Sequence, residues 1–448
     1  MDKRLSLNAF NVRMGVIFVL GIMMISGYVM PAVEAQDQVE FLGLAAITGG
    51  GDKAAQDLSG LPHTLLEDGV SYQDSFDGFG SAIAYTGYQD RYVLLADRGP
   101  NKIQYKNGEA VDNTTSYANR FQIADIALKK SADNHFEVAV QLKGTSLLKN
   151  EKGRQLIGIS TAFGTNEDTN LRRDTEGIRV APDGTVWTSD EYGPYIDHFN
   201  QKGQKIGSLE VPAAFLITHQ GATLAEEMKN NTSGRYTNRG GEGLAISPDG
   251  KVLVIALQGA LIQDGGLQGK FSRFLVYDLA NPKTAPKQLM YRLDSAKTAI
   301  SEILAVNDHQ FLVDERDGVG GPKGVKLLYL VDFKQSEKPM DVSSMASLPV
   351  SDSDVASRFV PLQKKLFADI GAILNAAKPF TTSAGMPDKI EGYAFGPDLP
   401  DGRHLLLATN DNDFSDTYPD YIFAFAVSPS TLPEFQALKL KNGVTFRP

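Results

Sequence analysis

The chain has 448 residues, with 44 Lys and Arg against 54 Asp and Glu, a formal net charge of −10 and no cysteine. The absence of cysteine excludes disulfides, thiolate metal sites and cysteine nucleophiles. The acidic balance argues against broad electrostatic binding to nucleic acid, which needs clustered cations. A hydrophobic content of 42% permits a large core, and 43 Gly residues with a single Trp favour a turn-rich β protein.

The N-terminus has the order of segments that is typical of a signal peptide. A basic stretch, residues 1–13, precedes an apolar run, residues 14–30, and small side chains then lead to Ala35. The alternative is a retained membrane anchor, because an apolar run of about 17 residues is close to the minimum for spanning a bilayer. We expect residues 1–35 to be a cleaved signal peptide. Residues 36–448 should form a single domain, periplasmic or extracellular, with no stable membrane span.

One sequence pattern recurs five times along the chain. An apolar run leads into a turn, often Pro-Asp-Gly, and a second apolar run then ends in acidic or amide residues. The clearest copy runs from Asp174 to Gly193, and in a degenerate first copy Gly80 stands where the others have Glu. The other copies begin at Gly241, Ser301 and Ile390. Two apolar runs joined by a turn that contains glycine predict a β-hairpin.

Each predicted hairpin is followed by a third apolar run and usually by a fourth. Four antiparallel strands repeated in this way predict an all-β fold, a β-propeller of five visible four-stranded blades with room for a sixth. A β-sandwich with similar turns is the alternative. The run from Gln38 to Ile47 is expected to supply the strand that closes the ring. A helix inserted before the last blade is predicted from apolar residues at helical spacing, which are Leu362, Leu366, Ile370 and Leu374.

The polar ends of the hairpins predict a metal site. A hairpin places the start of its first strand beside the end of its second, and the first strands of a propeller line its axis. Carboxylates should therefore converge at one mouth of the axis. The predicted metal ligands are Glu176, Asp190, Glu191, Glu242, Glu302, Asp314, Glu391 and Asp411. Crowded carboxylates need a compensating cation, and hard oxygen ligands indicate a divalent metal, with Ca²⁺ favoured in an exported protein.

A structural role is the alternative for each of these glutamates. The repeated Glu-Gly could clip one blade to the next if the carboxylate accepted backbone N–H bonds from the neighbouring hairpin. The aspartates of the Pro-Asp-Gly turns, Asp183, Asp249 and Asp401, are interpreted as turn formers that use their own side chains.

The ordered set of motifs resembles the phytase-like family described as having esterase-like activity. The resemblance covers about residues 75–428, and its motifs occur at residues 96–100, 174–177, 239–244, 313–316 and 391–392 with 410–412. It implies a β-propeller and the hydrolysis of phosphate or other esters.

A mechanism can be stated from these residues as a hypothesis. A metal at the mouth would polarise a phosphate ester and activate water. The predicted catalytic residues are Glu176 with three phosphate-binding arginines, Arg98, Arg239 and Arg316. The expected partner is a small-molecule ester or phosphorylated substrate bound by a monomer. Two other functions remain open: a non-catalytic ligand-binding propeller, and a metal-dependent lactonase or carboxylesterase.

Overall fold

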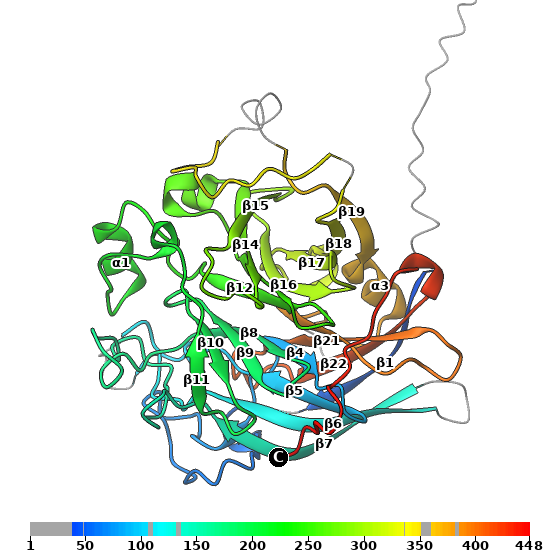
Figure 1. The fold of residues 1–448 in the computed structure, drawn as a ribbon. Coiled ribbons are helices and arrows are strands. Elements are labelled where there is room, and N and C mark those ends of the chain that lie inside the picture. The colour runs from blue at the N-terminus through cyan, green and yellow to red at the C-terminus, as the bar shows by residue number, and fades with distance from the viewer. Residues whose placement is uncertain are drawn as a thin grey trace, which may run out of the picture.

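The computed structural model describes residues 38–47, 49–105, 111–130, 136–335, 337–350, 360–380 and 385–448. The predicted signal peptide lies outside these residues. The described residues form five four-stranded antiparallel sheets, arranged as the blades of a propeller (Figure 1). A two-stranded sheet is too small to be a sixth blade. The five-bladed propeller is therefore confirmed.

The blades follow one another along the chain. Blade 1 contains β4 (Ala82–Tyr85), β5 (Arg91–Leu95), β6 (Arg120–Lys130) and β7 (Phe136–Leu147). Blade 2 contains β8 (Thr175–Val180), β9 (Val186–Asp190), β10 (Ile196–Phe199) and β11 (Lys205–Ser208). Blade 3 contains β12 (Gly241–Ile246), β13 (Val252–Leu257), β14 (Phe271–Asp278) and β15 (Lys287–Arg292). Blade 4 contains β16 (Ala299–Ala305), β17 (Gln310–Arg316), β18 (Lys326–Asp332) and β19 (Lys364–Asp369).

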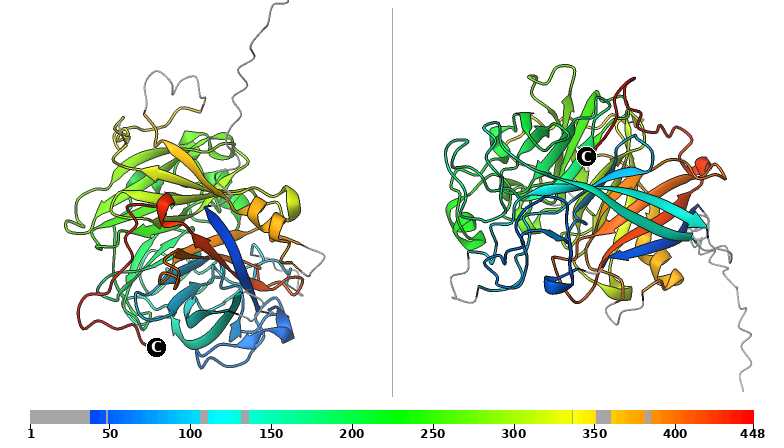
Figure 2. Two further views of the ribbon diagram at one scale, coloured as in Figure 1. Left: turned by 90° about the vertical axis from the view of Figure 1, so that its right-hand side faces the viewer. Right: turned by 90° about the horizontal axis from the view of Figure 1, so that it is seen from below.

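Blade 5 joins the two ends of the propeller. It contains β20 (Ile390–Phe395), β21 (His404–Asn410), β22 (Asp420–Val427) and β1 (Val39–Ile47). The N-terminal strand β1 pairs antiparallel with β22, from Val39 opposite Val427 to Ile47 opposite Asp420. Figure 2 shows β1, in blue, against the red-brown strands of the last blade. The predicted closing strand is confirmed, and blade 5 holds the ring shut.

The remaining elements are short. The two α-helices described are α1 (Leu224–Asn230) and α3 (Ile370–Ala377). The two-stranded sheet pairs β2 (Ala55–Gln56) with β3 (Ser75–Phe76). Short 3-10 helices occupy Gly51–Lys53, Ala213–Phe215, Ile262–Asp264, Gly266–Gln268, Gly321–Lys323 and Pro429–Thr431. None of the helices in these described ranges is long and apolar enough to cross a membrane.

The helix predicted before the last blade is present but shorter than its apolar spacing indicated. Leu366 lies in β19, the outer strand of blade 4, and only Ile370 and Leu374 lie in α3. The side chain of Asp369 caps the helix by accepting the backbone N–H of Ala372 at 2.8 Å. The part of the prediction that assigned Leu362 and Leu366 to this helix is therefore wrong.

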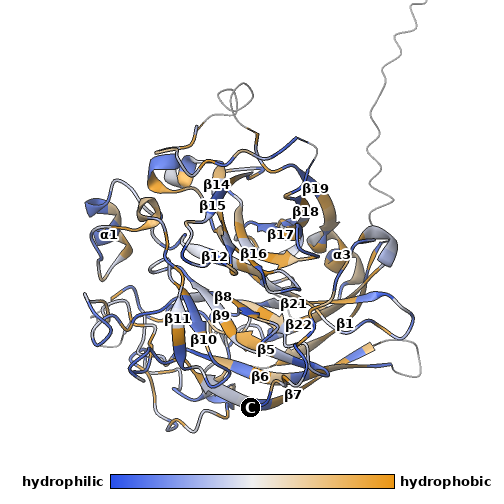
Figure 3. Cartoon of the chain, viewed as in Figure 1, coloured by the Kyte–Doolittle hydropathy of each residue, from blue (hydrophilic) through white to orange (hydrophobic). Residues whose placement is uncertain are grey.

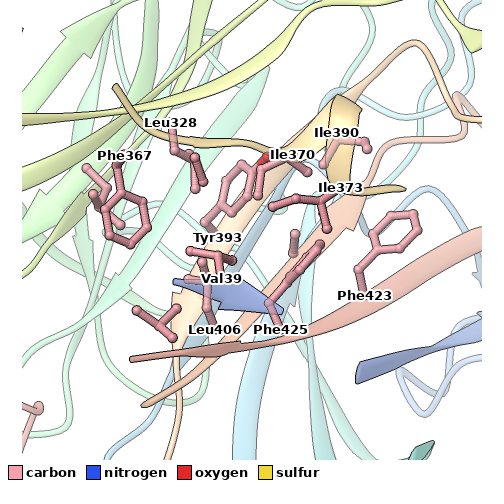
Figure 4. Packing of buried hydrophobic residues seen from close by; sticks show 14 of the residues in the cluster. Val39, Leu328, Phe367, Ile370, Ile373, Ile390, Tyr393, Leu406, Phe423 and Phe425 are labelled. Atoms are coloured by element: carbon pink, nitrogen blue, oxygen red, sulfur yellow. The ribbon is translucent and has the colours of Figure 1, made fainter. Parts of the chain in front are cut away.

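Apolar side chains fill the spaces between adjacent blades. Figure 3 shows hydrophobic residues along strands such as β5 and β16. Figure 4 shows the core between blades 4 and 5, where Ile370 and Ile373 of α3 pack toward Val39 of β1 and Phe425 of β22. Every residue of β22 is buried, because sheets cover both of its faces. Helix α3 therefore packs over the junction between blades 4 and 5, where the ring closes.

The inner strands of adjacent blades approach so closely that the glycine of Glu-Gly is required. A Cβ at Gly243 would lie 2.7 Å from the Ile303 nitrogen, and one at Gly392 would lie 2.9 Å from the Ala82 Cα. Backbone at these distances cannot move aside without separating the blades. The repeated glycine is therefore required because the backbones of adjacent blades leave no room for a side chain at the propeller axis.

We predict that Gly392→Val lowers the free energy of unfolding by roughly 1–3 kcal/mol, because the added side chain overpacks two backbones. Gly207→Val is the matched control, since a Cβ at Gly207 meets no heavy atom within 4 Å. The control should change stability by no more than about 0.5 kcal/mol. Denaturant unfolding of the two variants measures the difference. Equal stabilities would contradict the close approach.

Candidate functional site: carboxylates at one end of the propeller axis

The inner strands of three blades carry a β-bulge at the same point. In β8 the pairing with β9 passes from Thr175 to Gly177, so Glu176 has no partner across the hairpin. The same shift leaves out Glu242 in β12 and Glu391 in β20. A bulge leaves one residue unpaired and redirects its side chain. These glutamates therefore occupy equivalent positions where their strands begin.

The bulge in blade 4 falls one residue earlier than the sequence repeat suggested. In β16 the register passes from Ile300 to Glu302, so Ser301 is the residue left out. Glu302 instead takes the position that Gly177 has in blade 2. Its Oε1 accepts the N–H of Leu244 from blade 3 at 3.1 Å, and its Oε2 lies 2.7 Å from Arg179 Nη2. Glu302 thus acts as the clip between blades, and the alignment that set it level with Glu176 is wrong by one residue.

The sequence alignment of blade 1 with the other blades is also wrong by one residue. Ala82 pairs with Leu95 in the way that Gly177 pairs with Ser189. Ser81, rather than Gly80, is therefore the equivalent of Glu176. The hydroxyl of Ser81 is buried and has no hydrogen-bond partner among the described residues.

The second strands supply one polar side chain per blade beside these bulges. In each blade the residue after the bulge pairs with a residue of the second strand. The polar side chain lies two positions after that pairing partner. The set is Asp97, Glu191, Gln258, Arg316 and Asp411. Gln258 contacts the bulged glutamate of its own blade, since Gln258 Nε2 donates to Glu242 Oε1 at 2.9 Å.

Carboxylates of blades 1 to 3 form a tight group, here called the carboxylate cluster: Asp97, Asp174, Glu176, Glu191 and Glu242. Oxygens of Glu176, Glu191 and Glu242 all lie within 4.8 Å of one another, and so do oxygens of Asp97, Asp174 and Glu176. Glu176 belongs to both triads. The cluster can thus offer several oxygen ligands to one cation.

One oxygen of Glu242 is the strongest evidence in the cluster for a bound cation. Its side chain is 3% exposed, and Gln258 occupies only Oε1. Its Oε2 is buried and has no hydrogen-bond partner among the described residues. An unpaired buried carboxylate oxygen is costly, so an oxygen in this position fits a bound cation.

The pKa shifts of these carboxyls agree with a site that needs a cation. Burial raises the pKa of Glu176 well above its ordinary value, and the charges of Glu242 and Asp174 raise it further. Burial likewise raises the pKa of Glu242, with Glu191 adding to the effect. Without a cation, Glu176 and Glu242 therefore keep their protons to a higher pH than free carboxylates do.

The three predicted arginines differ in what they contact. Arg98 Nη1 bonds Asp174 and lies 2.7 Å from Asn238 Oδ1, while its Nε and Nη2 have no hydrogen-bond partner in the described part of the chain. Arg316 is fully engaged, since it donates to Ser301 Oγ at 2.6 Å, to the Asp317 carbonyl and to Glu391.

Arg239 is the third arginine. Its half-buried guanidinium makes no hydrogen bond or ion pair with any described residue.

The other predicted ligands lie around the cluster, and Asp190 and Asp411 have partners of their own. Asp190 accepts the N–H of Asp174 at 2.6 Å and that of Gly193 at 2.9 Å, and burial raises its pKa to about 7. Asp411 lies 2.9 Å from Lys389 Nζ. Asp314 is buried opposite Glu302 in blade 4, and neither of its carboxylate oxygens has a hydrogen-bond partner among the described residues.

Glu391 completes the set of predicted ligands. It forms an ion pair with Arg316. Burial raises its pKa to about 7, although Arg316 and Lys389 oppose that shift.

Sequence reasoning missed Asp174 and Lys389 as site residues. Each lies two positions before a bulged glutamate, Asp174 before Glu176 and Lys389 before Glu391. The signal was this shared spacing, which becomes visible once the repeats are aligned on the bulge.

Comparison with known proteins gives one distant relative by sequence. An uncharacterized secreted protein of Arthroderma benhamiae is 24% identical over 330 residues, which are 60% of this chain and 61% of the relative. The chain thus spans less than two thirds of that relative's length.

Solved structures resemble the chain only loosely. A luciferin-regenerating enzyme has a TM-score of 0.35 at 10% identity, covering 82% of this chain and 96% of its own. A gluconolactonase of Xanthomonas campestris has a TM-score of 0.32 at 10% identity, covering 85% and 97%. The Dos1 propeller has a TM-score of 0.30 at 9% identity, covering 91% and 100%.

A family model, Phytase-like and described as "esterase-like activity of phytase", matches residues 74–414. That range includes four of the five blades in full and the whole carboxylate cluster. The chain belongs to the Phytase-like family.

Proposed function

We propose that the protein is an exported hydrolase of phosphate or other esters that uses a divalent metal at the carboxylate cluster. The observation that carries the proposal is Glu242 Oε2, a buried oxygen without a hydrogen-bond partner beside Glu176 and Glu191. The family description, which names esterase-like activity, supports the reaction class. The secreted relative supports export.

The donor set fits a hard cation. Glu176, Glu191 and Glu242 would hold it, with Asp97 and Asp174 as further ligands. All of these ligand atoms are carboxylate oxygens, which favours Ca²⁺ or Mg²⁺, and we propose Ca²⁺ because it accepts irregular arrangements of oxygens. When bound, the ion supplies Lewis acidity for the ester and lowers the pKa of water at the site.

The chain's own residues would orient the substrate and move a proton. Arg98 keeps Nε and Nη2 available for an oxyanion while Nη1 is fixed on Asp174. Glu391, with a pKa of about 7, can accept or release a proton near neutral pH. Arg316 is a positioning residue, because its contacts with Ser301 and Glu391 fix the carboxylate in place.

We predict that Glu242→Gln weakens Ca²⁺ binding roughly tenfold or more, because it removes a charged ligand from the triad. Isothermal titration calorimetry on the full chain measures the affinity. Glu337→Gln, at an exposed glutamate, is the control and should bind as the unaltered protein does. Identical affinities in Glu242→Gln and the control would contradict the site.

Turnover should depend on the same cluster. Hydrolysis of an aryl phosphate and of an aryl acetate, each with Ca²⁺ and with a chelator, shows which ester is cleaved and whether the metal is needed. We expect Glu176→Gln to lower kcat/KM by about 100-fold or more, since this residue belongs to both triads. Ca²⁺ binding without cleavage of either ester would instead support a non-catalytic binding propeller.

Without metal, stability should fall as pH rises. The folded pKa values of Glu176, Glu242 and Glu391 lie above their ordinary values, so the folded state keeps protons that the unfolded state has lost. The stability present below about pH 4.5 is therefore lost as pH rises through these raised folded pKa values, which for Glu391 is about 7. With a chelator, we expect the Tm to drop by roughly 5 °C between pH 5 and pH 8.

Two comparisons isolate the cluster in that experiment. Ca²⁺ at pH 8 should restore the Tm, because the ion replaces the lost protons. Glu242→Gln should flatten the dependence on pH, since it removes one of the titrating carboxyls. An unchanged slope in this variant would show that other groups cause the loss.

A further inference from the structure

A pocket beside the carboxylate cluster combines exposed apolar side chains with a free cation. Leu224 and Met228 of α1 and Leu267 line one part of it, and Asn238, Arg239 and Gln258 line another. Leu224 is 41% exposed and Leu267 is 42% exposed. Figure 1 shows α1 on the left of the ring, outside blades 2 and 3. Large apolar side chains that converge in one exposed pocket are typical of a ligand-binding surface.

The guanidinium of Arg239 is held in place but not neutralised. An added Cβ at Gly259 would lie 3.1 Å from Arg239 Nη1, so the side chain rests on backbone that carries no side chain of its own. This guanidinium makes no hydrogen bond or ion pair with any described residue. The nearby Arg235, by contrast, is buried and bonds Glu227 Oε2 at 2.7 Å. An unpaired, half-buried guanidinium is suited to a bidentate oxyanion.

The pocket and the cluster share a wall. Gln258 lines the pocket and donates to Glu242 Oε1 at 2.9 Å. Gly240, which follows Arg239 in the chain, donates its N–H to Glu191 Oε1 at 3.3 Å. A ligand in the pocket therefore lies next to the Glu191 and Glu242 side of the cluster.

We infer that the pocket selects an aryl or alkyl phosphate, with the oxyanion between Arg239 and the cluster and the apolar group against Leu224, Met228 and Leu267. This assignment rests on the proposed function, because it takes the cluster as the place where the ester bond is cleaved. The apolar wall offers few hydrogen bonds to a hydroxyl-rich or polyphosphorylated group. Sugar and cyclitol phosphates are accordingly poor ligands, and Arg239 determines specificity through the phosphate.

Phenylphosphonate is the probe, since its P–C bond resists hydrolysis and binding is separated from turnover. Methylphosphonate carries the charge without the ring, and benzyl alcohol carries the ring without the charge. Titrations of the full chain with Ca²⁺, followed by calorimetry, should show phenylphosphonate binding roughly tenfold more tightly than either compound. Thermal unfolding of each variant shows that it remains folded.

Variants then separate the two parts of the pocket. Arg239→Gln should weaken phenylphosphonate binding about tenfold, and Arg239→Lys should recover part of that loss. Leu267→Ser and Met228→Ser should bring phenylphosphonate down to the affinity of methylphosphonate. Arg154→Gln is the control and should leave every affinity unchanged, since this exposed arginine has Asp168 as its one ion-pair partner among the described residues.

The outcomes distinguish this inference from the proposed function. Equal affinity for the phenyl and methyl compounds, or binding that Arg239→Gln leaves unchanged, overturns the pocket. Cleavage of phenyl phosphate with a kcat/KM unaffected by Arg239→Gln and Leu267→Ser also overturns it, while the hydrolase stands. Binding that depends on Arg239 without cleavage of phenyl phosphate supports the pocket and overturns the hydrolase.

Discussion

The close approach of the inner strands is the constraint on which the site depends. No side chain fits at Gly243 or Gly392, where the backbone of the next blade lies within about 3 Å of a built Cβ. The bulge immediately before this glycine places an extra residue at the start of the strand, and that residue is a glutamate in three blades. Five blades that meet this closely bring their strand ends together, so the carboxylates are crowded by the same packing that stabilises the ring.

The negative charges of the crowded carboxylates are neutralised by different partners around the axis. Glu391 has Arg316, and Glu302 has Arg179 together with a backbone N–H. Glu176 and Glu242, by contrast, have no ion pair with any described residue. Carboxylates without an ion pair among the described residues are therefore found in the cluster of blades 1 to 3 and also at Asp314 of blade 4. The close grouping of oxygens in the two triads, rather than the number of acids, favours the cluster as the place for a cation.

The sequence predicted the five hairpins and the closing strand because alternation and turn residues act locally. It could not place the bulge, which depends on pairing across the hairpin, so Glu302 was aligned one residue out of register with Glu176. The helix error has a similar cause. Leu362 and Leu366 are four residues apart, a spacing that puts side chains on one face of a helix and also of a strand. Pairing with β18 determined the strand at Leu366.

Arg179 connects the inner strands of blades 1 and 4 across the propeller axis. Its guanidinium crosses the axis of the propeller and donates to the carbonyl of Ile83 in blade 1 at 3.1 Å and to that of Ile303 in blade 4 at 3.0 Å. Beyond it lies an apolar pocket that Phe435 and Leu438 of the C-terminal segment help to line. A buried guanidinium with these bonds is costly to displace. Under the proposed function, a ligand would therefore arrive from the cluster side, where the pocket of Arg239 would receive its organic part.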